Sequence, residues 1–325
     1  MKDRKLDHIR ICLEKDVEAG SAGFEMVRLA HRALPELNLD EVNTEIEFLG
    51  KTLEYPLIIE GITGGTKEAE KINRDLAEIS QELGIGFGVG SQRIAIEDKA
   101  LESTFEVRDI APDILLIANL GAIQLNNDYG LDECKKAIEM IDADALALHL
   151  NPLQEAIQPE GERNFSGLIE KVNEISSKLD KPVIAKEVGS GISHEIAARL
   201  KVDAIDVGGS GGTSWSLVEG YRANQEEIGK TFAGWGIPTA DCIREVSGNV
   251  PVIGSGGVRS GLDAAKAIAL GADCVGIALP VLKAYSADGK KGARKFLNRF
   301  LTELRIAMFL TGSGTVGELR GRVRE

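Results

Sequence analysis

The chain has 325 residues, of which 43% are hydrophobic and 27% are charged, a composition typical of a soluble globular protein. Its net charge of −13, without a basic stripe, argues against a nucleic-acid-binding surface, which needs clustered cations to neutralise phosphates. No apolar run approaches the roughly 18 residues of a membrane span, and the N-terminal segment MKDRKLDH lacks the apolar centre of a signal peptide. We expect a cytoplasmic protein with neither nucleic-acid nor membrane partners.

Four cysteines are widely spaced along the chain, with no CxxC pair and no metal-ligand pattern: Cys12, Cys134, Cys242 and Cys274. Free Cys behaves as a small apolar residue and is among the most buried residue types. The pattern therefore predicts buried free thiols in a reducing compartment.

Short apolar runs alternate with segments of helical periodicity through most of the sequence. Nearly continuous apolar runs are typical of strands buried on both faces of a parallel sheet. The runs comprise residues 55–62, 84–90, 114–121, 145–151, 182–189, 204–209, 251–257 and 274–280. The segments with helical periodicity comprise residues 67–83, 133–141, 168–179, 194–200, 240–246, 262–270 and 293–310.

Strict alternation of strand and helix predicts parallel pairing with right-handed crossovers. Eight such units close naturally into a TIM (β/α)₈ barrel, an α/β fold that reaches this length as one domain. A doubly wound open sheet is the alternative, but such a sheet typically carries a phosphate-binding GxGxxG motif after its first strand. The nearest pattern in this chain has Arg93 in place of the third glycine. We predict one barrel domain over residues 1–325, with 1–54 as an N-terminal extension and 210–236 as an insertion after strand six.

Active sites of these barrels lie at the carboxyl ends of the strands, where this chain carries glycines and polar side chains. Glycine clusters follow strands six and seven, and a helix is predicted over residues 260–270. Glycine lets backbone N–H groups approach a phosphate, and a helix N-terminus adds a favourable dipole. The two clusters together favour a phosphate site, although glycines can also serve tight turns alone.

Lys186 and Glu187 end the fifth strand. Because neighbours on a strand face opposite sides, we expect no ion pair between them, and we expect Lys186 to point to the barrel mouth. Flavin barrels place a lysine where it stabilises negative charge on the reduced ring. Schiff-base chemistry is the competing interpretation.

The fourth strand end holds the densest polar group. His149 and Asn151 are two residues apart on a strand and face the same side, and Gln154 and Glu155 follow at once. The carboxamide and carboxylate side chains beside His149 favour a functional role for this histidine over a packing role. A carboxylate facing a phosphate-rich pocket would be repelled without an intervening cation, so Glu155 is a candidate Mg²⁺ ligand rather than a base.

Near the N-terminus, Arg4, Lys5 and His8 form a compact basic cluster, and Arg4 and His8 would share a helix face. The default interpretation of such a cluster is a solvated terminal run of charge.

Taken together, these residues resemble the FMN-dependent, type 2 isopentenyl-diphosphate delta-isomerases from Arg4 to about Arg322. The most specific segments are RKxxH from Arg4 and HLNPLQExxQPEG from His149. Further shared motifs are TGGT at 63–66, GSQR at 90–93, ANLG at 118–121, KEVG at 186–189, GGTSW at 211–215 and GGVRSG at 256–261. One departure is Ile62, where many members carry methionine, which puts the packing at the flavin edge in doubt.

The resemblance implies a role for each matching residue. The flavin ring and ribityl chain would be contacted by Gly61, Ile62, Thr63, Ser91, Asn119, Lys186 and Thr213, and the phosphate end by Gly257, Val258, Arg259, Ala278 and Leu279. The substrate would be bound by Arg4, Lys5, His8, Ser91, Gln92, Arg93 and Gln154. Catalysis would involve Gln154, His149 and Asn151, with Glu155 holding Mg²⁺ on the diphosphate.

Moving a double bond requires adding a proton at one carbon and removing one from another, and no side chain is an obvious acid for an alkene. Reduced FMN can supply and take back that proton, so we expect the cofactor to carry the step. The sequence has no nicotinamide fingerprint, which implies an external reductant such as NADPH. By the same resemblance we expect a homo-oligomer, a tetramer or octamer, although the sequence itself does not reveal the oligomeric state.

Three alternatives differ in chemistry. An FMN-dependent 2-hydroxy-acid oxidase or dehydrogenase would need a histidine base near strand seven, yet no histidine follows His194. An enzyme like inosine-monophosphate dehydrogenase would need a cysteine nucleophile after strand six, where residues 209–213 contain none. A non-catalytic flavin or nucleotide sensor would have no need of Gln154 and Glu155.

Overall fold

Eight parallel strands close into a barrel in the computed structural model, which describes residues 2–248 and 250–324, with side chains from Lys5 onward. The strands follow one another around the barrel in chain order, and the last pairs with the first. They are β3 (Leu57–Ile59), β4 (Gly86–Gly88), β5 (Leu116–Gly121), β6 (Ala145–Leu150), β7 (Val183–Glu187), β8 (Ala204–Asp206), β9 (Val252–Ser255) and β10 (Cys274–Ile277). All eight predicted strands and the predicted TIM barrel are confirmed.

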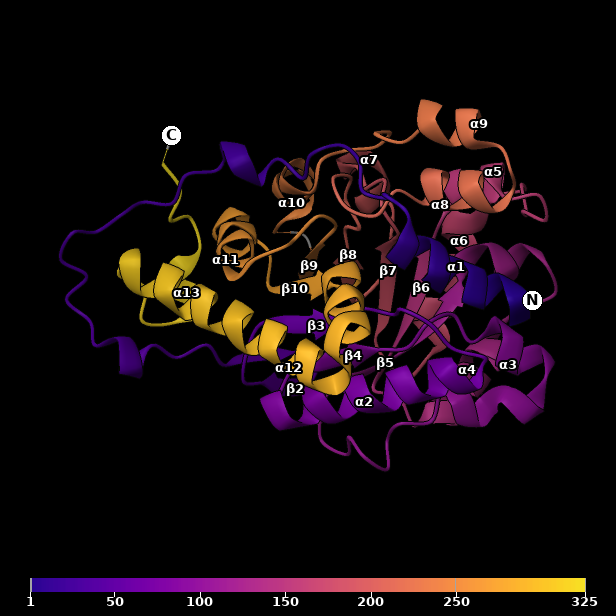
Figure 1. Cartoon of the computed structure of the whole chain (residues 1–325), viewed down its shortest axis with the longest axis horizontal. Coiled ribbons are helices and arrows are strands. Elements are labelled where there is room, and N and C mark those ends of the chain that lie inside the picture. The colour runs from indigo at the N-terminus through magenta and orange to yellow at the C-terminus, as the bar shows by residue number, and fades with distance from the viewer. Residues whose placement is uncertain (1, 249, 325) are drawn as a thin grey trace.

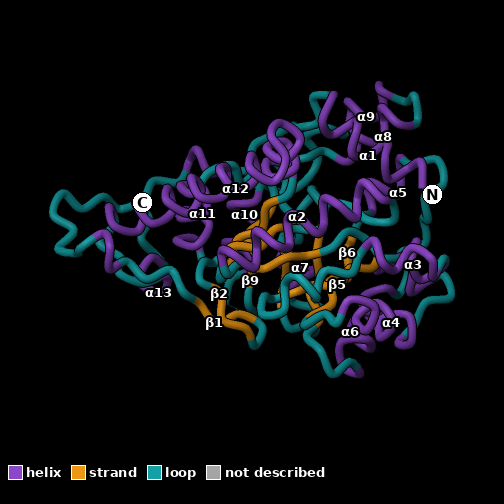
Figure 2. The backbone as a smooth tube through the Cα atoms, turned by 60° about the horizontal axis from the view of Figure 1, so that its bottom comes forward, coloured by secondary structure: helices purple, strands orange, loops and turns teal. Residues whose placement is uncertain are grey.

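Helices surround the strands on all sides (Figures 1 and 2). In chain order they are α2 (Lys67–Leu83), α3 (Arg93–Glu97), α4 (Leu131–Ile141), α5 (Pro152–Ile157), α6 (Leu168–Lys178), α7 (His194–Ala197), α8 (Trp215–Arg222), α9 (Glu226–Thr231), α10 (Thr239–Val246), α11 (Gly261–Leu270), α12 (Leu279–Leu310) and α13 (Val316–Leu319). Helices α8 and α9 lie in the insertion after β8, and no helix among the described residues is both long and apolar enough to cross a membrane.

The long helix α12 differs from the prediction, which began it at Ala293. Its backbone leaves helical geometry at Asp288 and Gly289, where the glycine has a φ of 55°. Because the break at Asp288 and Gly289 interrupts the helical spacing of apolar residues, the sequence showed a helical period only for the part of α12 that follows the break. The additional first turn matters because it begins at the barrel mouth.

Two apolar clusters follow from the period of two along each strand. Leu57, Ile59 and their counterparts on other strands pack outward against the helices, whereas Ile58 and Ile184 belong to a separate cluster. Because successive side chains of a strand point to opposite faces, the separate cluster is the barrel interior. Its strand members are Ile58, Leu115, Ile117, Ala145, Ala147, Ile184, Ala204, Ile253 and Cys274.

The same period places polar side chains one layer closer to the mouth. Two residues after an inward apolar residue, the chain again faces inward, so Lys186 follows Ile184 and Asp206 follows Ala204. The inward residues of this layer are Glu60, Asn119, His149, Lys186, Asp206, Ser255 and Gly276. An apolar floor therefore lies beneath a ring of polar groups.

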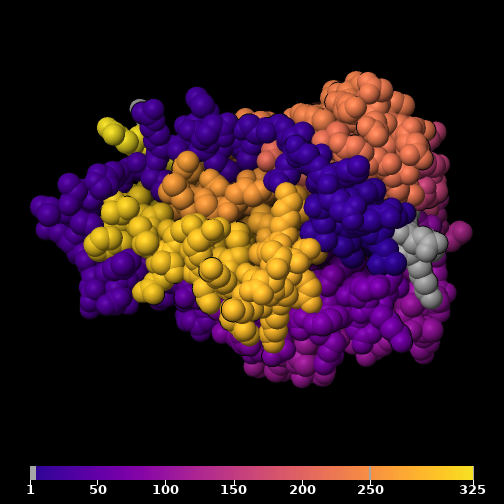
Figure 3. Space-filling model, viewed as in Figure 1, coloured from indigo at the N-terminus to yellow at the C-terminus, as the bar shows by residue number. Residues whose placement is uncertain are grey.

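The N-terminal extension contributes to both ends of the barrel. The hairpin of β1 (Ile46–Phe48) and β2 (Lys51–Leu53) inserts Phe48 and Leu53 into the interior cluster at the amino ends of the strands. At the opposite end, α1 (Lys2–Glu14) packs against α8 and α12 (Figure 3). The sequence predicted the extent of this segment, but neither the hairpin nor its closure of the barrel floor.

All four cysteines are free and buried, as the sequence predicted. Burial raises the pKa of the Cys12, Cys134 and Cys242 thiols to about 12. These thiols are therefore neutral packing groups rather than nucleophiles.

Candidate functional site

A large cavity opens at the carboxyl ends of the barrel strands. It has about 1570 Å³ of empty space, part of which is open solvent at the mouth. Its walls come from every barrel strand end and from α1. The cavity thus brings residues of the whole barrel rim and of the N-terminal extension to one space.

Most of the predicted site residues line this cavity. They are Lys5, His8, Gly61, Ile62, Ser91, Arg93, Asn119, His149, Asn151, Gln154, Glu155, Lys186, Thr213, Gly257, Val258, Arg259, Ala278 and Leu279. The side chain of Arg4 lies outside the described residues.

Two predicted residues lie apart from the cavity. The Gln92 amide is fully buried behind the strand end, where Nε2 donates to the Ala137 carbonyl at 2.8 Å and Oε1 accepts from the Asn119 N–H at 2.9 Å. Its side chain therefore fixes the loop and the strand and does not face a substrate. Thr63 is also buried, and its carbonyl accepts from the Gly90 N–H at 3.1 Å.

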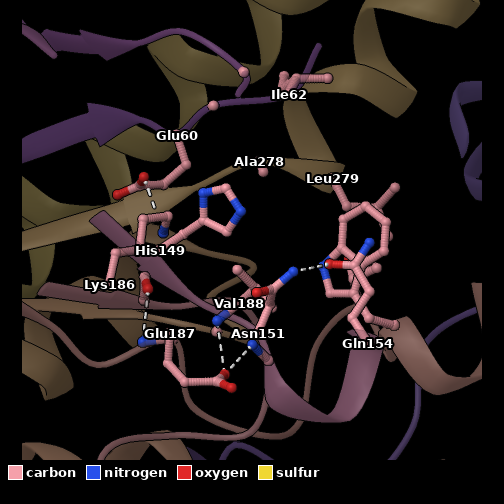
Figure 4. A pocket seen from close by; sticks show the side chains of 18 of the residues that line it. Glu60, Ile62, His149, Asn151, Gln154, Lys186, Glu187, Val188, Ala278 and Leu279 are labelled. Atoms are coloured by element: carbon pink, nitrogen blue, oxygen red, sulfur yellow. Dashed lines mark hydrogen bonds and ion pairs between the residues drawn. The ribbon is translucent and has the colours of Figure 1, made fainter. Parts of the chain in front are cut away.

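Lys186 sits between two carboxylates that the sequence analysis missed, Glu60 and Asp206, and Figure 4 shows the contact with Glu60. Its Nζ lies 3.1 Å from Glu60 Oε2 and makes a short hydrogen bond to Asp206 Oδ2. Burial alone would lower the pKa of Lys186, but Asp206 and Glu60 outweigh it and raise that pKa above its ordinary value. A lysine held charged in this way is not the neutral amine that a Schiff base needs.

Glu187 points to the opposite side of β7 from Lys186, as the sequence predicted. Its carboxylate turns away from Lys186 and accepts hydrogen bonds from the backbone N–H groups of residues 188–191, at 2.5–3.2 Å. Burial raises the pKa of Glu187 to about 7, although the four donors oppose the shift. This side chain holds the loop that follows β7.

The polar group after β6 is joined into one network. Asn151 Nδ2 donates to Glu155 Oε1 at 2.9 Å and to Gln154 Oε1 at 3.2 Å. On the barrel wall, His149 Nδ1 lies within hydrogen-bond distance of Asn119 Oδ1, at 2.8 Å. The sequence predicted that these side chains would gather at the mouth, and the structure places them together there.

Glu219, on α8, completes this network from the insertion. It is fully buried, and its Oε1 accepts from Gln154 Nε2 at 3.0 Å and lies 2.9 Å from His8 Nε2. Arg222 Nε donates to Oε2 at 2.6 Å. Burial would raise the pKa of Glu219, but the hydrogen bonds and charge of His8, Gln154 and Arg222 lower it to about 2.

Glu219 thereby connects α1 to the residues after β6. The His8 ring packs edge-on against Trp215, with centroids 5.2 Å apart. Lys5 Nζ reaches the Ser91 carbonyl at 3.4 Å on the other wall. The N-terminal basic cluster is thus not the solvated run of charge that its sequence suggested by default, because Lys5 and His8 both face the cavity.

The glycine-rich end of the cavity corrects one expectation. The predicted N-terminus of α11 is already occupied, because Asp263 accepts from the N–H groups of Arg259 and Ser260, and Glu303 accepts from that of Gly261. Arg259 itself lines the cavity and donates from Nε to Glu18 Oε1 at 2.7 Å. Arg259 therefore places a cation at this end of the cavity, whereas the N–H groups of residues 259–261 are engaged within the protein.

The chain matches known proteins along nearly its whole length. The sequence pattern of the FMN-dependent dehydrogenase family matches residues 140–324. An isopentenyl-diphosphate delta-isomerase of Ignicoccus hospitalis is 52% identical over 98% of this chain and 92% of that protein. Proteins of the same name from Nostoc and Synechocystis are 49% and 51% identical, over 98% and 97% of this chain and 94% and 93% of their own.

Solved structures with lower identity show the same fold. A mandelate oxidase with an FMN adduct superposes with a TM-score of 0.64 at 22% identity, covering 94% of this chain and 89% of that one. A lactate oxidase of Pediococcus acidilactici gives a TM-score of 0.66 at 20% identity, covering 96% and 84%. This likeness supports the barrel architecture alone.

Replacing the carboxylate at Glu219 should change how stability depends on pH. Because the folded-state pKa of about 2 lies below the ordinary 4.5, ionised Glu219 stabilises the fold above about pH 4.5, and this contribution is lost as the pH falls towards 2. Between about pH 4.5 and about pH 3, wild type should lose about 2 kcal/mol more unfolding free energy than Glu219→Gln, at about 1.4 kcal/mol per pH unit.

Urea denaturation at several pH values measures this difference. The matched control is Glu226→Gln, which alters an exposed glutamate on α9 and should follow wild type. Parallel curves for wild type and Glu219→Gln would show that Glu219 carries no strongly depressed pKa.

Proposed function

Since the chain belongs to the isopentenyl-diphosphate delta-isomerase family, of the FMN-dependent type, we propose that reduced FMN serves as its acid–base group and Mg²⁺ holds the diphosphate. The observation that carries the proposal is the ring of polar side chains, centred on Lys186, on the floor of a cavity lined by residues from every barrel strand end. The isomerase activity and FMN follow from family membership. The reduced state, the metal and the residue roles are proposed.

The residues present fit FMN. Lys186 offers a fixed positive charge on the cavity floor, and at the opposite end of the glycine loops Arg259 offers a second one. Glu60 Oε1, in a residue that lines the cavity, is buried without a hydrogen-bond partner among the described residues, as expected where a polar ligand completes the site. We propose that the ring lies over Lys186 and Asn119 and that the phosphate lies near Arg259 and the start of α12.

The substrate diphosphate has a second cationic region. Lys5 and Arg93 line the cavity from α1 and α3, away from Arg259. Arg93 is held by Glu97 at 2.9 Å and by Glu162 at 3.0 Å. In a chain of net charge −13, such local cations are what can attract an anion. We assign the diphosphate to this side, with Arg4 and Ser91 as further contacts.

The alkene would then lie between the flavin and the network after β6. When bound in its reduced form, FMN supplies an exchangeable proton that an alkene can accept and later return. Gln154 is held by Asn151 and Glu219, so its amide is fixed at the cavity wall. We propose that Gln154 orients the reacting carbons, while His149 and Asn151 position the polar end. Trp215 and α1 restrict water.

The side chains fit an Mg²⁺ ion that is held jointly by the protein and the diphosphate, rather than one held by protein ligands alone. Among the described residues, no group of three or more acidic, histidine or cysteine side chains could hold a metal. Glu155 lines the cavity, where its Oε1 accepts from Asn151 and its Oε2 from Gln158, and Asn151 Oδ1 beside it has no hydrogen-bond partner among the described residues. Mg²⁺ commonly uses one or two carboxylates, waters and substrate phosphates. We therefore propose that Glu155 and the diphosphate share the ion.

The remaining expectations stay proposals. Four buried free thiols support a reducing compartment, here the cytoplasm. An external donor such as NADPH would keep the flavin reduced. We also propose a homo-oligomer, a tetramer or octamer, because exposed apolar side chains such as Met26 and Leu34 occur on the extension. Light scattering at the mass of a single 34.8 kDa chain would contradict this.

The principal experiment is an anaerobic assay of the purified protein. The protein should be yellow. After reduction with dithionite in the presence of Mg²⁺, it should convert isopentenyl diphosphate to dimethylallyl diphosphate, and mass spectrometry or NMR detects that product. Turnover that proceeds in air without reductant would favour an oxidase. Colourless protein that stays inactive with added reduced FMN would refute the proposal.

Gln154→Ala should lower kcat by 10²-fold or more, because positioning and proton transfer each contribute at least about that factor. Flavin absorbance should remain unchanged, since Gln154 lies on the substrate side. Gln81→Ala, on the outer helix α2, is the matched control and should keep full activity. A Gln154→Ala protein with near-normal kcat would remove this residue from the mechanism.

Glu155→Gln should raise the Mg²⁺ concentration required for half-maximal activity about 10–100-fold, as expected on loss of a metal-binding partner. FMN binding should be unaffected, which a flavin titration checks. The exposed Glu170→Gln on α6 serves as the control. An unchanged Mg²⁺ requirement would exclude Glu155 as a ligand.

A further inference from the structure

Three ionisable side chains form a cluster under the cavity: Lys186 and Asp206 lie on the adjacent strands β7 and β8, and Glu60, which follows β3, reaches them across the barrel. One cation faces two carboxyl groups, so the cluster carries a net charge of −1 when all three are ionised. All three are nearly excluded from solvent, with side-chain exposures of 10%, 12% and 1%. Such an uncompensated buried charge is costly, and a bound proton removes it.

The proton has a preferred location within the cluster. Both oxygens of Asp206 accept short hydrogen bonds, Oδ2 from Lys186 and Oδ1 from the Ser255 hydroxyl. In Glu60, Oε2 faces Lys186, whereas Oε1 is buried without a hydrogen-bond partner among the described residues. A Cβ added at Gly276 would lie 2.3 Å from Glu60 Oε1. This free oxygen therefore lies against the cavity wall, where a proton can be added without breaking a contact.

The surroundings of Glu60 favour the protonated form. Burial first, and then the charge of Asp206, raise the pKa of Glu60 to about 8, although Lys186 opposes the shift. On β10, Cys274 stays a neutral thiol, because burial raises its pKa well above the ordinary value. His149 on β6 is engaged by Asn119. Glu60 can thus change its protonation state at about pH 8.

Reduction of a flavin by two electrons increases its negative charge, and under the proposed function this charge develops directly above the cluster. We propose that Glu60 is a positioning residue for the reduced cofactor: it is protonated when bound FMN is reduced, and it takes up that proton from solvent wherever its carboxylate was ionised beside oxidised FMN. The two electrons pass from an external donor to FMN, and the proton forms an O–H bond on Glu60. The cluster then has no net charge to oppose the reduced flavin.

This coupling has a defined dependence on pH. Below about pH 8, Glu60 is already protonated with oxidised FMN bound, so reduction adds no proton to it. Above about pH 8, it is ionised with oxidised FMN, and reduction adds one. Above about pH 8, the two-electron midpoint potential should therefore fall with rising pH by about 29.6 mV per pH unit more than it does below pH 8. This is the potential that corresponds to a tenfold change in proton concentration for one proton and two electrons. Ionisation of the reduced flavin itself would bend the curve the opposite way.

The test is a spectroscopic redox titration of the FMN-loaded full chain at pH values on both sides of pH 8. Wild type should show the steeper slope on the alkaline side, and Glu60→Gln should keep the slope found on the acid side throughout. Below pH 8 the two proteins should have similar potentials. Equal slopes for wild type and Glu60→Gln, or a wild-type curve with no steepening, would overturn the proposal.

Asp206→Asn provides an independent arm in case Glu60→Gln does not fold. Removing the negative charge of Asp206 favours ionised Glu60, so the steepening should move to lower pH; a bend that stays in place would contradict the coupling. This inference rests on the proposed function, but the titration measures no turnover. A chain that binds no FMN would refute the proposed function, whereas a bound flavin with a pH response independent of Glu60 would refute this inference alone.

Discussion

The alternation of side chains along strands of a closed barrel determines the rest of this structure. A strand that contributes an apolar residue to the interior contributes its next inward side chain two residues later, one layer nearer the mouth. Ile184 and Lys186 on β7, and Ala204 and Asp206 on β8, show the pattern. Because barrel closure brings all strand ends to one rim, residues far apart in sequence meet in one polar layer above a packed floor.

The polar layer meets a second constraint, which is charge. A chain of net charge −13 can hold anionic ligands only if some of its cations are fixed where they are needed. Lys186 is fixed by Glu60 and Asp206, and Arg259 by Glu18. Each cation is therefore paired with carboxylates before a ligand arrives, and the carboxylates around Lys186 outnumber it. This arrangement lets the protein bury positive charge without the full desolvation cost, and makes protonation of the carboxylates part of the ligand chemistry.

A third element closes the site from outside the barrel. The insertion carries Glu219, which joins His8 on α1 to Gln154 after β6. The extension and the insertion are remote in sequence and neither belongs to the barrel proper. Their contact through one buried carboxylate is what gives the cavity its outer wall, so removal of that charge should affect stability and site geometry together.

The sequence was sufficient to predict the barrel strands and many of the residues at the site, and the reason for success or failure differs from residue to residue. The strands were recognisable because all eight are continuous apolar runs, and the inward orientation of Lys186 followed from the period of two. Glu60 was missed because it stands as one charge at the end of an apolar run, and Glu219 because it lies in an insertion without a strand to orient it. Gln92 matched a motif, yet its amide turns into the core. Pairwise contacts across the barrel are not encoded in local spacing, so these required the structure.

The central claim is that reduced flavin bound above Lys186 is the group that exchanges the proton. Reconstitution of flavin-free protein with reduced 5-deazaFMN tests it most directly, because carbon replaces the ring nitrogen N5 and carries no readily exchangeable proton. The account predicts that this analogue binds in place of FMN but supports no conversion of isopentenyl diphosphate. Turnover at the rate seen with reduced FMN would contradict it.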